Sequence, residues 1–248
     1  MITRRAVLSL AAAVALAGCG GPLYDQLPVH VARAAGSQWK LVGQYGPSQL
    51  ARWKPAPWAA NNRQQIACYT RANVSSGTEL LMQITQRPCD GKPESGAWLQ
   101  SPVKWRYGMF EARIYLPASG SGEIANWPAF WLEDPNDWPV NGEIDAMEVL
   151  NGWDCQSVHY GPAVHQMRTV KTSPNCVLDR PGWHTFAVTW SATLVQWYVD
   201  GHLTGAVSSH VPHHWMQIVL DYTAWRGQIN NLAPATMRVA WIRIFKLR

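Results

Sequence analysis

The stretch that decides the fold of this chain spans residues 141–150 and reads Asn-Gly-Glu-Ile-Asp-Ala-Met-Glu-Val-Leu. On a regular strand, side chains alternate between two faces, so Glu143 and Asp145 would share one face and Glu148 would point into the core. Burying an ionised carboxylate in the core is costly. One extra residue at Ala146-Met147, a β-bulge, removes the conflict because all three acids then face one way. The stretch therefore predicts a bulged strand with an acidic face.

These three acids indicate acid–base and nucleophilic chemistry. Glu143 and Glu148 would stand about 13 Å apart between Cα atoms, at ~3.3 Å per residue. Their side chains can lean together to reach the ~5–5.5 Å of a retaining glycosidase. Asp145 adds a like charge, which raises at least one pKa and keeps one carboxyl group protonated near neutral pH. A solvated acidic strand face is the alternative, but only 15% of the residues are charged, so we favour catalysis.

The rest of the chain predicts further strands and little helix. Short β-type runs are separated by turn signals, and Asp200-Gly201 between two runs is typical of a two-residue hairpin. We see no three turns of capped helical periodicity and no linker rich in Pro, Gly and Ser after residue 38. We therefore expect one all-β domain at residues 38–248, a sandwich or barrel. The expected strands include 78–85, 107–116, 183–190, 194–199 and 237–247.

The N-terminus predicts export. A short cationic start precedes an apolar stretch, Ala6 to Ala17, that is too short to span a bilayer. The run that ends it, Leu16-Ala17-Gly18-Cys19, resembles the bacterial lipobox, in which the Cys becomes the lipidated first residue. An ordinary signal peptide with a chance Cys is the alternative. We expect a signal peptide at 1–18, a tether at 19–37, and a secreted or cell-surface lipoprotein that meets the membrane only through its lipid anchor.

The remaining cysteines fit an oxidising compartment. Setting Cys19 aside leaves four of the five Cys, an even number. Three pairings are possible, and proximity in sequence favours Cys68–Cys89 and Cys155–Cys176. No two of these Cys have the close spacing of a zinc knuckle. We therefore expect two disulfides.

The composition bounds the class of partner. The formal charge of +5 comes from scattered Lys and Arg, so nucleic acid is not indicated. The chain has 15 Trp against 4 Phe, and a core has no reason to prefer Trp, whose N–H needs a partner when buried. Trp rings are natural platforms for pyranose rings, although many of these Trp can simply be core residues. The composition therefore favours a carbohydrate partner.

The acidic run and its flanks resemble glycoside hydrolase family 16, in the bulged form Glu-x-Asp-x-x-Glu of laminarinase-type β-glucanases. The resemblance implies a β-jelly-roll sandwich of two antiparallel sheets, concanavalin-like, with a substrate cleft on the concave face and retention of anomeric configuration. It implies that Glu143 is the nucleophile, Glu148 the general acid/base and Asp145 the carboxylate that orients them. The similar flanks are Tyr107 to Arg113, Trp127 to Leu132, Trp138 to Gly142, Val158 to Gly161, Trp183 to Val188 and Trp197 to Gly201.

The resemblance also suggests substrate-binding residues. Trp127 and Trp131 would share one strand face, and the family similarity places them under the sugars beside the cleavage point, unless one only buttresses the sheet. His159 would lie near the carboxylates as a partner of Asp145 or of substrate; an unrelated structural His is the alternative. Weaker candidates for the rim of the cleft are Trp138, Trp153 and Trp225.

One departure from the family concerns calcium. Many members end with a strand containing Val-Asp-Trp/Tyr-Val-Arg, whose Asp helps to hold a structural calcium on the convex side. Here that strand reads Val239-Ala240-Trp241-Ile242-Arg243, with Ala240 at the Asp position. Calcium prefers several charged oxygen ligands, and Ala240 provides none. We therefore expect no metal and no cofactor.

Together these features predict a monomeric, retaining endo-β-glucanase acting on β-1,3 or mixed β-1,3/1,4 linkages. The bulged run favours these substrates over those of the strict mixed-linkage lichenases, whose run is one residue shorter. A transglycosylase or galactan-cleaving relative with the same three acids is an alternative. A non-catalytic carbohydrate-binding jelly roll is another, but three mutually repelling carboxylates argue against it.

Overall fold

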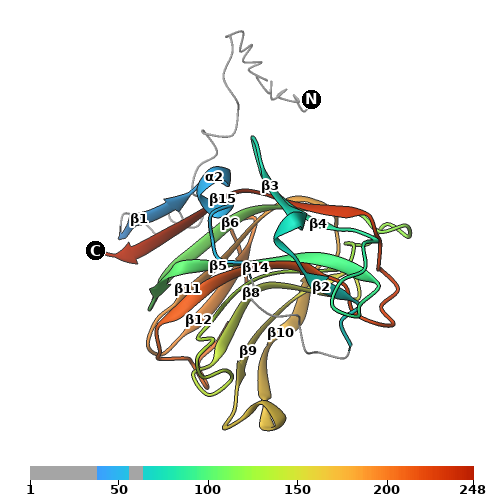
Figure 1. Ribbon diagram of the computed structural model, residues 1–248. Coiled ribbons are helices and arrows are strands. Elements are labelled where there is room, and N and C mark those ends of the chain that lie inside the picture. Colours follow the sequence, from blue (N-terminus) through green and yellow to red (C-terminus); the bar gives the residue numbers. More distant parts are fainter. Residues whose placement is uncertain (1–37, 56–63) are drawn as a thin grey trace, which may run out of the picture.

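The computed structural model describes residues 38–55 and 64–248, which form two β-sheets packed face to face (Figure 1). The first, here called the outer sheet, contains in spatial order β13 (His202–Val207), β12 (Val195–Val199), β11 (Gly182–Trp190), β6 (Gly108–Leu116), β15 (Ala235–Leu247), β4 (Leu80–Ile84) and β3 (Val74–Ser76), with β1 (Trp39–Tyr45) pairing β15.

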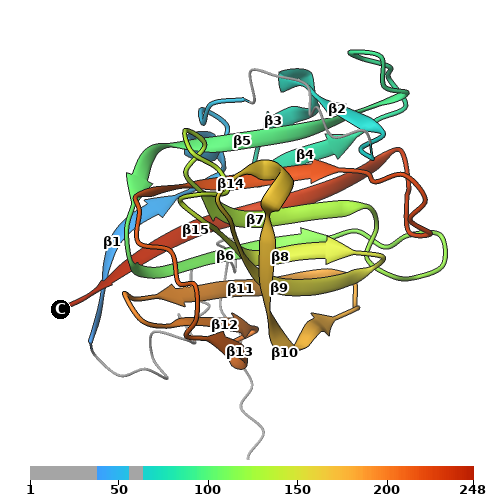
Figure 2. The same ribbon diagram turned by 90° about the horizontal axis from the view of Figure 1, so that it is seen from below.

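The second, here called the cleft sheet, contains β10 (Arg168–Leu178), β9 (Trp153–Tyr160), β8 (Glu143–Leu150), β7 (Trp127–Glu133), β14 (Met216–Thr223), β5 (Glu94–Trp105) and β2 (Ala67–Tyr69). Its strands β5, β14, β7, β8 and β9 lie side by side in Figure 2. Named strands pair antiparallel except β2 with β5. Helical elements in the described residues are short: α2 (Pro47–Leu50), η2 (Arg71–Asn73) and η3 (Val164–Gln166). The predicted all-β sandwich is confirmed.

The core lies between the two sheets because each strand sends alternate side chains inward. Phe110 and Ile114 of β6 and Leu220 of β14 belong to one hydrophobic cluster and are fully buried. Burial of one such side chain stabilises the fold by roughly 1.5–3 kcal/mol. Alternation leaves the other face of the cleft sheet free to carry polar groups.

The turn between β12 and β13 forms where the sequence predicts it. Asp200 and Gly201 have φ of 50° and 83°. Both values lie in the left-handed region that a two-residue hairpin turn of this type requires, and glycine adopts it without strain. The turn therefore joins two adjacent strands of the outer sheet directly.

Two disulfides join the pairs that sequence proximity favoured, Cys68–Cys89 and Cys155–Cys176. The second links cross-strand partners on β9 and β10. The expected signal peptide, the tether and Cys19 lie outside the described residues. Across the two described ranges, no helix combines the length and the apolar character needed to cross a membrane.

Candidate active site

Strand β8 contains the bulge that its sequence predicts. Asp145 pairs with Trp131 of β7, and Glu148 pairs with Ala129 two residues away on that strand. On the other side Asp145 pairs with Ser157 of β9, and the partner of Glu148 is again two residues away. Between these two acids β8 therefore has one residue more than either neighbour. As a result Glu143, Asp145 and Glu148 line a cleft, whereas Ile144, Ala146, Met147 and Val149 lie in the core.

The cleft over this sheet has a volume of about 880 Å3 and is rich in indole rings. Strand β7 alternates without interruption, so Trp127 and Trp131 line the cleft while Phe130 lies in the core. Of the three weaker candidates for the rim, Trp138 and Trp225 line the cleft, whereas Trp153 is not among its lining in the described part of the chain.

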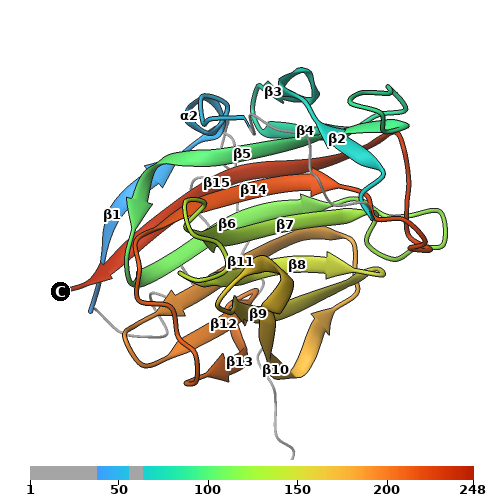
Figure 3. The same cartoon turned by 60° about the horizontal axis from the view of Figure 1, so that its bottom comes forward.

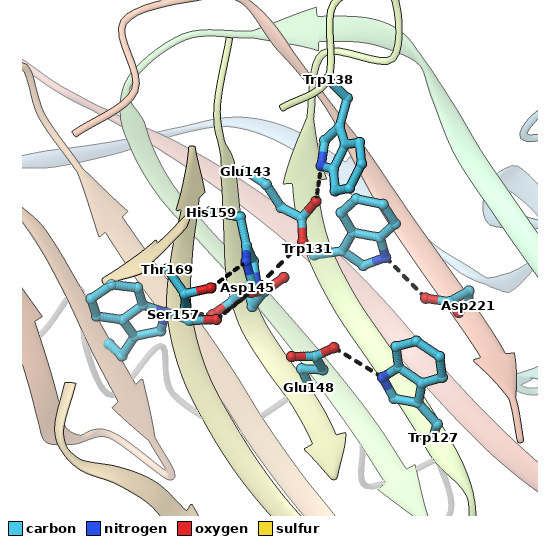
Figure 4. A network of polar contacts seen from close by, with 11 residues as sticks. Trp127, Trp131, Trp138, Glu143, Asp145, Glu148, Ser157, His159, Thr169 and Asp221 are labelled. Carbon is cyan, nitrogen blue, oxygen red and sulfur yellow. Dashed lines mark hydrogen bonds and ion pairs between the residues drawn. The ribbon is translucent and has the colours of Figure 1, made fainter. Parts of the chain in front are cut away.

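Each catalytic glutamate candidate accepts a hydrogen bond from an indole N–H (Figure 4). Trp127 Nε1 donates to Glu148 Oε1 at 3.0 Å, and Trp138 Nε1 donates to Glu143 Oε2. An indole nitrogen is a donor only, so each bond fixes a carboxyl oxygen as an acceptor. The aromatic lining thus orients the acids as well as shaping the cleft.

Asp145, between the two glutamates, is held by its neighbours on β9. Ser157 Oγ donates to Asp145 Oδ2 at 2.5 Å, and His159 Nε2 lies 3.1 Å from the same oxygen. The Nδ1 atom of His159 lies 2.9 Å from Thr169 Oγ1, so the imidazole ring is held at both nitrogens. The structure therefore places His159 beside Asp145, as the resemblance implied.

Burial and like charge both act on the acids of this site. Burial, followed by the charge of Asp145, raises the pKa of Glu148 to about 8. The same two causes hold the pKa of Glu143 well above its usual range. Burial lowers the pKa of His159, but Asp145 outweighs that effect and the net pKa is raised. A carboxyl group with a pKa near 8 carries a proton at neutral pH, as a general acid must.

Two further buried acids line the cleft and were missed in the sequence. Glu133 on β7 stands directly opposite Glu143, and burial, Asp221 and Asp134 raise its pKa to about 8. Burial raises the pKa of Asp221 on β14 to about 7. Strand alternation from Trp131 could have found Glu133. Asp221 lies in a largely apolar strand without a motif, so no comparable signal pointed to it.

Within the described residues, one group of side chains has donor atoms close enough to hold a metal ion. Ligand atoms of Glu143, Asp145 and His159 lie within 4.8 Å of one another. Those of Asp145 and His159 already contact each other and Ser157. These hydrogen bonds account for the close approach of the three side chains.

Comparisons with known proteins agree with this geometry. The model of the family described as glycosyl hydrolases family 16 matches residues 60–243. A "Beta-glucanase" of Rhodothermus marinus is 27% identical over 221 residues, 74% of each chain. "Endo-1,3-1,4-beta-glycanase EglC" of Rhizobium meliloti is 35% identical over 197 residues, which are 71% of this chain and 40% of that protein.

Solved structures share the fold. The laminarinase from Rhodothermus marinus superposes with a TM-score of 0.68 at 22% identity, covering 85% of this chain and 98% of that one. The catalytic domain of the Thermotoga maritima laminarinase gives a TM-score of 0.68 at 21% identity, with 85% and 99% covered. At this identity the likeness shows the jelly-roll architecture.

Proposed function

This chain belongs to glycosyl hydrolases family 16 and is a glycoside hydrolase with a polysaccharide substrate, and from that premise we propose that it is a retaining endo-β-glucanase with Glu143 as nucleophile and Glu148 as acid/base. The observation that carries the proposal is the bulge of β8, because it brings Glu143, Asp145 and Glu148 onto the cleft face. The β-1,3 or mixed β-1,3/1,4 linkage is proposed from the names of the relatives.

In the first step, a carboxylate oxygen of Glu143 bonds to the anomeric carbon while the glycosidic C–O bond breaks. Glu148 gives its proton to the departing sugar oxygen, which is the role its raised pKa suits. In the second step Glu148, now ionised, takes a proton from water. The water oxygen bonds to the anomeric carbon and releases Glu143, so two inversions give net retention.

The nucleophile must be ionised, although burial and the charge of Asp145 raise the pKa of Glu143. The Trp138 indole N–H donates to a Glu143 oxygen and so favours the carboxylate form of this residue. In this proposal Asp145, held by Ser157 and His159, orients the two glutamates.

Azide rescue of two variants tests the roles. Glu148→Ala should still form the intermediate from an activated aryl glycoside, which needs no proton to depart, and then stall for want of a base. Azide needs no base, so it should restore turnover and give a β-glycosyl azide. Glu143→Ala should be nearly inactive on every substrate, and azide attacking in place of the missing carboxylate should give the α-azide.

Exchange of the two azide products would reverse the assignment, and wild-type activity in either variant would remove the site. Laminarin, lichenan and agarose, followed by reducing ends and by product size, test the substrate. Cleavage of agarose in place of the glucans would make the chain a galactanase. Longer products formed from oligosaccharides would indicate transglycosylation.

We also propose that the domain at 38–248 works as a monomer outside the cytoplasm, tethered through lipidated Cys19. The two disulfides support an oxidising compartment. Replacing Cys19 by Ser should release the protein from the membrane fraction and abolish labelling by a fatty-acid analogue. Unchanged membrane association would count against the anchor, and light scattering tests the monomer.

A further inference from the structure

One buried carboxyl group joins two aromatic walls of the cleft. Asp221 lies on β14 between β5 and β7 and is 4% exposed. Its Oδ1 accepts a hydrogen bond from Trp131 Nε1 at 2.9 Å (Figure 4). Its Oδ2 accepts one from the Tyr69 hydroxyl at 2.8 Å. The Tyr69 hydroxyl in turn accepts from Gln65 Nε2 at 2.8 Å. The carboxyl group therefore connects Trp131 on β7 to Tyr69 on β2, the strand beside β5 in Figure 3.

The ring that this carboxyl group holds stands at the catalytic centre. Trp131 is the cross-strand partner of Asp145 and lines the cleft. Trp98 meets it edge to face, with ring centroids 5.2 Å apart. Packing against Trp98 limits where the indole lies. The hydrogen bond fixes which edge of the indole faces Asp221, because Nε1 is the one donor of the ring. Together these contacts determine which ring face is presented to a sugar.

A purely structural role accounts poorly for an acid at this position. Burial raises the pKa of Asp221 to about 7, with hydrogen bonds from Tyr69 and Trp131 acting in the opposite direction. An apolar side chain of similar size would avoid the desolvation that this carboxyl group suffers. What such a side chain could not do is accept hydrogen bonds from two buried aromatic donors. The position therefore suits an acceptor that orients rings.

We propose that Asp221 is a positioning residue for substrate binding, which fixes the ring of Trp131 as the platform for the sugar next to Asp145. The inference rests on the proposed β-glucanase function and deepens it. Asp221 acts through Trp131 and takes no part in the bond-making steps. Its removal should therefore weaken binding of the polysaccharide more than it slows the chemistry.

The test compares Asp221→Ala with Asp221→Asn on laminarin. Alanine leaves the Trp131 N–H and the Tyr69 hydroxyl without their acceptor, and KM should rise about tenfold while kcat changes less than about threefold. Asparagine keeps an oxygen for Trp131 and offers its NH2 group to the Tyr69 oxygen, so KM should stay within about threefold of the wild-type value. A KM for Asp221→Ala like that of the wild type would overturn the inference. So would an asparagine variant as impaired as the alanine variant.

A second comparison separates action through Trp131 from direct contact with substrate. In a Trp131→Phe background, which lacks the indole N–H, Asp221→Ala should raise KM by less than about twofold further. The full tenfold rise in that background would overturn the inference. If Asp221→Ala does not fold, Tyr69→Phe decides: it removes one of the two donors and should raise KM about threefold in the wild-type background but not in Trp131→Phe. An equal effect in both backgrounds would overturn the inference.

Failure of the β-glucanase proposal would give a different result from failure of the inference about Asp221. A wild-type chain that cleaves neither laminarin nor lichenan would refute the β-glucanase proposal, and this inference would fall with it. Normal wild-type cleavage together with a KM that is insensitive to Asp221→Ala would refute this inference alone.

Discussion

Asp200, at the edge of the outer sheet, and the acids of the cleft are held in opposite ways. In the turn at the edge of the outer sheet, Asp200 accepts hydrogen bonds from the backbone N–H of Thr185 at 2.8 Å and from His184 Nδ1 at 2.7 Å, with Arg113 at 3.7 Å. Partial burial would raise the pKa of Asp200, but these donors and charges outweigh it, and the pKa is lowered. This acid is stable as an anion because each of its oxygens faces a donor or a cation.

In the cleft sheet the acids face one another. Glu143 stands opposite Glu133 across β7 and β8, and burial is the first cause of a raised pKa for both. Glu148 behaves in the same way. Like charges placed directly opposite destabilise a sheet. What marks the cleft is that several acids with raised pKa values gather there. The outer sheet also buries one acid, Glu111, whose pKa burial raises to about 7, but this residue stands alone opposite Arg243.

The largest expected effect separates activity from stability. Glu143→Gln removes the proposed nucleophile and should lower activity on laminarin by ~10³-fold or more. It also replaces a buried acid, whose ionisation is opposed by burial and by Asp145, with a neutral amide, so the melting temperature should stay the same or rise by about 2–4 °C. The matched outer-sheet variant, Asp200→Asn, should keep full activity and melt a few degrees lower. Assays for reducing ends and thermal unfolding of both variants test the contrast, which a destabilised Glu143→Gln would break.

A second expected effect concerns the bulge that creates the acidic face. Deletion of Ala146 leaves Glu143, Ile144, Asp145, Met147 and Glu148 in strict alternation, so the acids keep one face and β8 can pair with both neighbours without an extra residue. Activity should remain within about tenfold of the wild-type value, after a small loss of packing at this buried position.

Deletion of Ile144 is the matched control, because it puts Glu143 and Asp145 on opposite faces. Activity should vanish and the melting temperature should fall. If the Ala146 deletion were as inactive as this control, alternation would not be what aligns the acids, and the cleft would depend on the bulge itself.

The third effect is a pH dependence of opposite sign for Asp200 and for the cleft acids. A group whose folded-state pKa is raised stabilises the fold below its unfolded pKa, and this contribution is lost as pH rises through the folded value. Glu133 and Glu148, with pKa values raised to about 8, should make the melting temperature fall between pH 5 and 9. Asp200 has a lowered pKa, so its contribution is present above its unfolded pKa and is lost in acid.

The melting temperature measured as a function of pH tests both predicted changes in stability. Glu133→Gln should reduce the fall between pH 5 and 9 by about 5 °C. Asp200→Asn should leave that fall unchanged and reduce the loss of stability below pH 4. A melting temperature that is constant from pH 5 to 9 in the wild-type chain would contradict the account of the cleft acids.

Local patterns in the sequence predicted an all-β sandwich or barrel and the three aligned acids, whereas the jelly roll was implied by the family resemblance. The bulge follows from the conflict between Glu148 and Met147, and Trp127 and Trp131 follow from alternation. Asp221 and its partner Tyr69 were not predicted, because they come from strands far apart in the sequence that meet only in the folded sheet. Trp153 was a weaker candidate for the rim and is not part of the cleft lining in the described residues, because residue type alone does not specify the direction of a side chain.

The smallest expected effect is the absence of any response to chelation, and it concerns the outer sheet. Strand β15 has a register shift between Val239 and Trp241 in its pairing with β6, so Ala240 is the extra residue at this point. An alanine methyl group offers no oxygen to calcium, which prefers several charged oxygen ligands.

A ligand that binds the folded state raises the melting temperature, and its removal lowers it. EDTA should therefore leave the melting temperature within about 1 °C. A drop of several degrees, reversed by added calcium, would show that other residues form a calcium site. The outer sheet would then stabilise acids with a metal ion as well as with the donors and cations seen around Asp200.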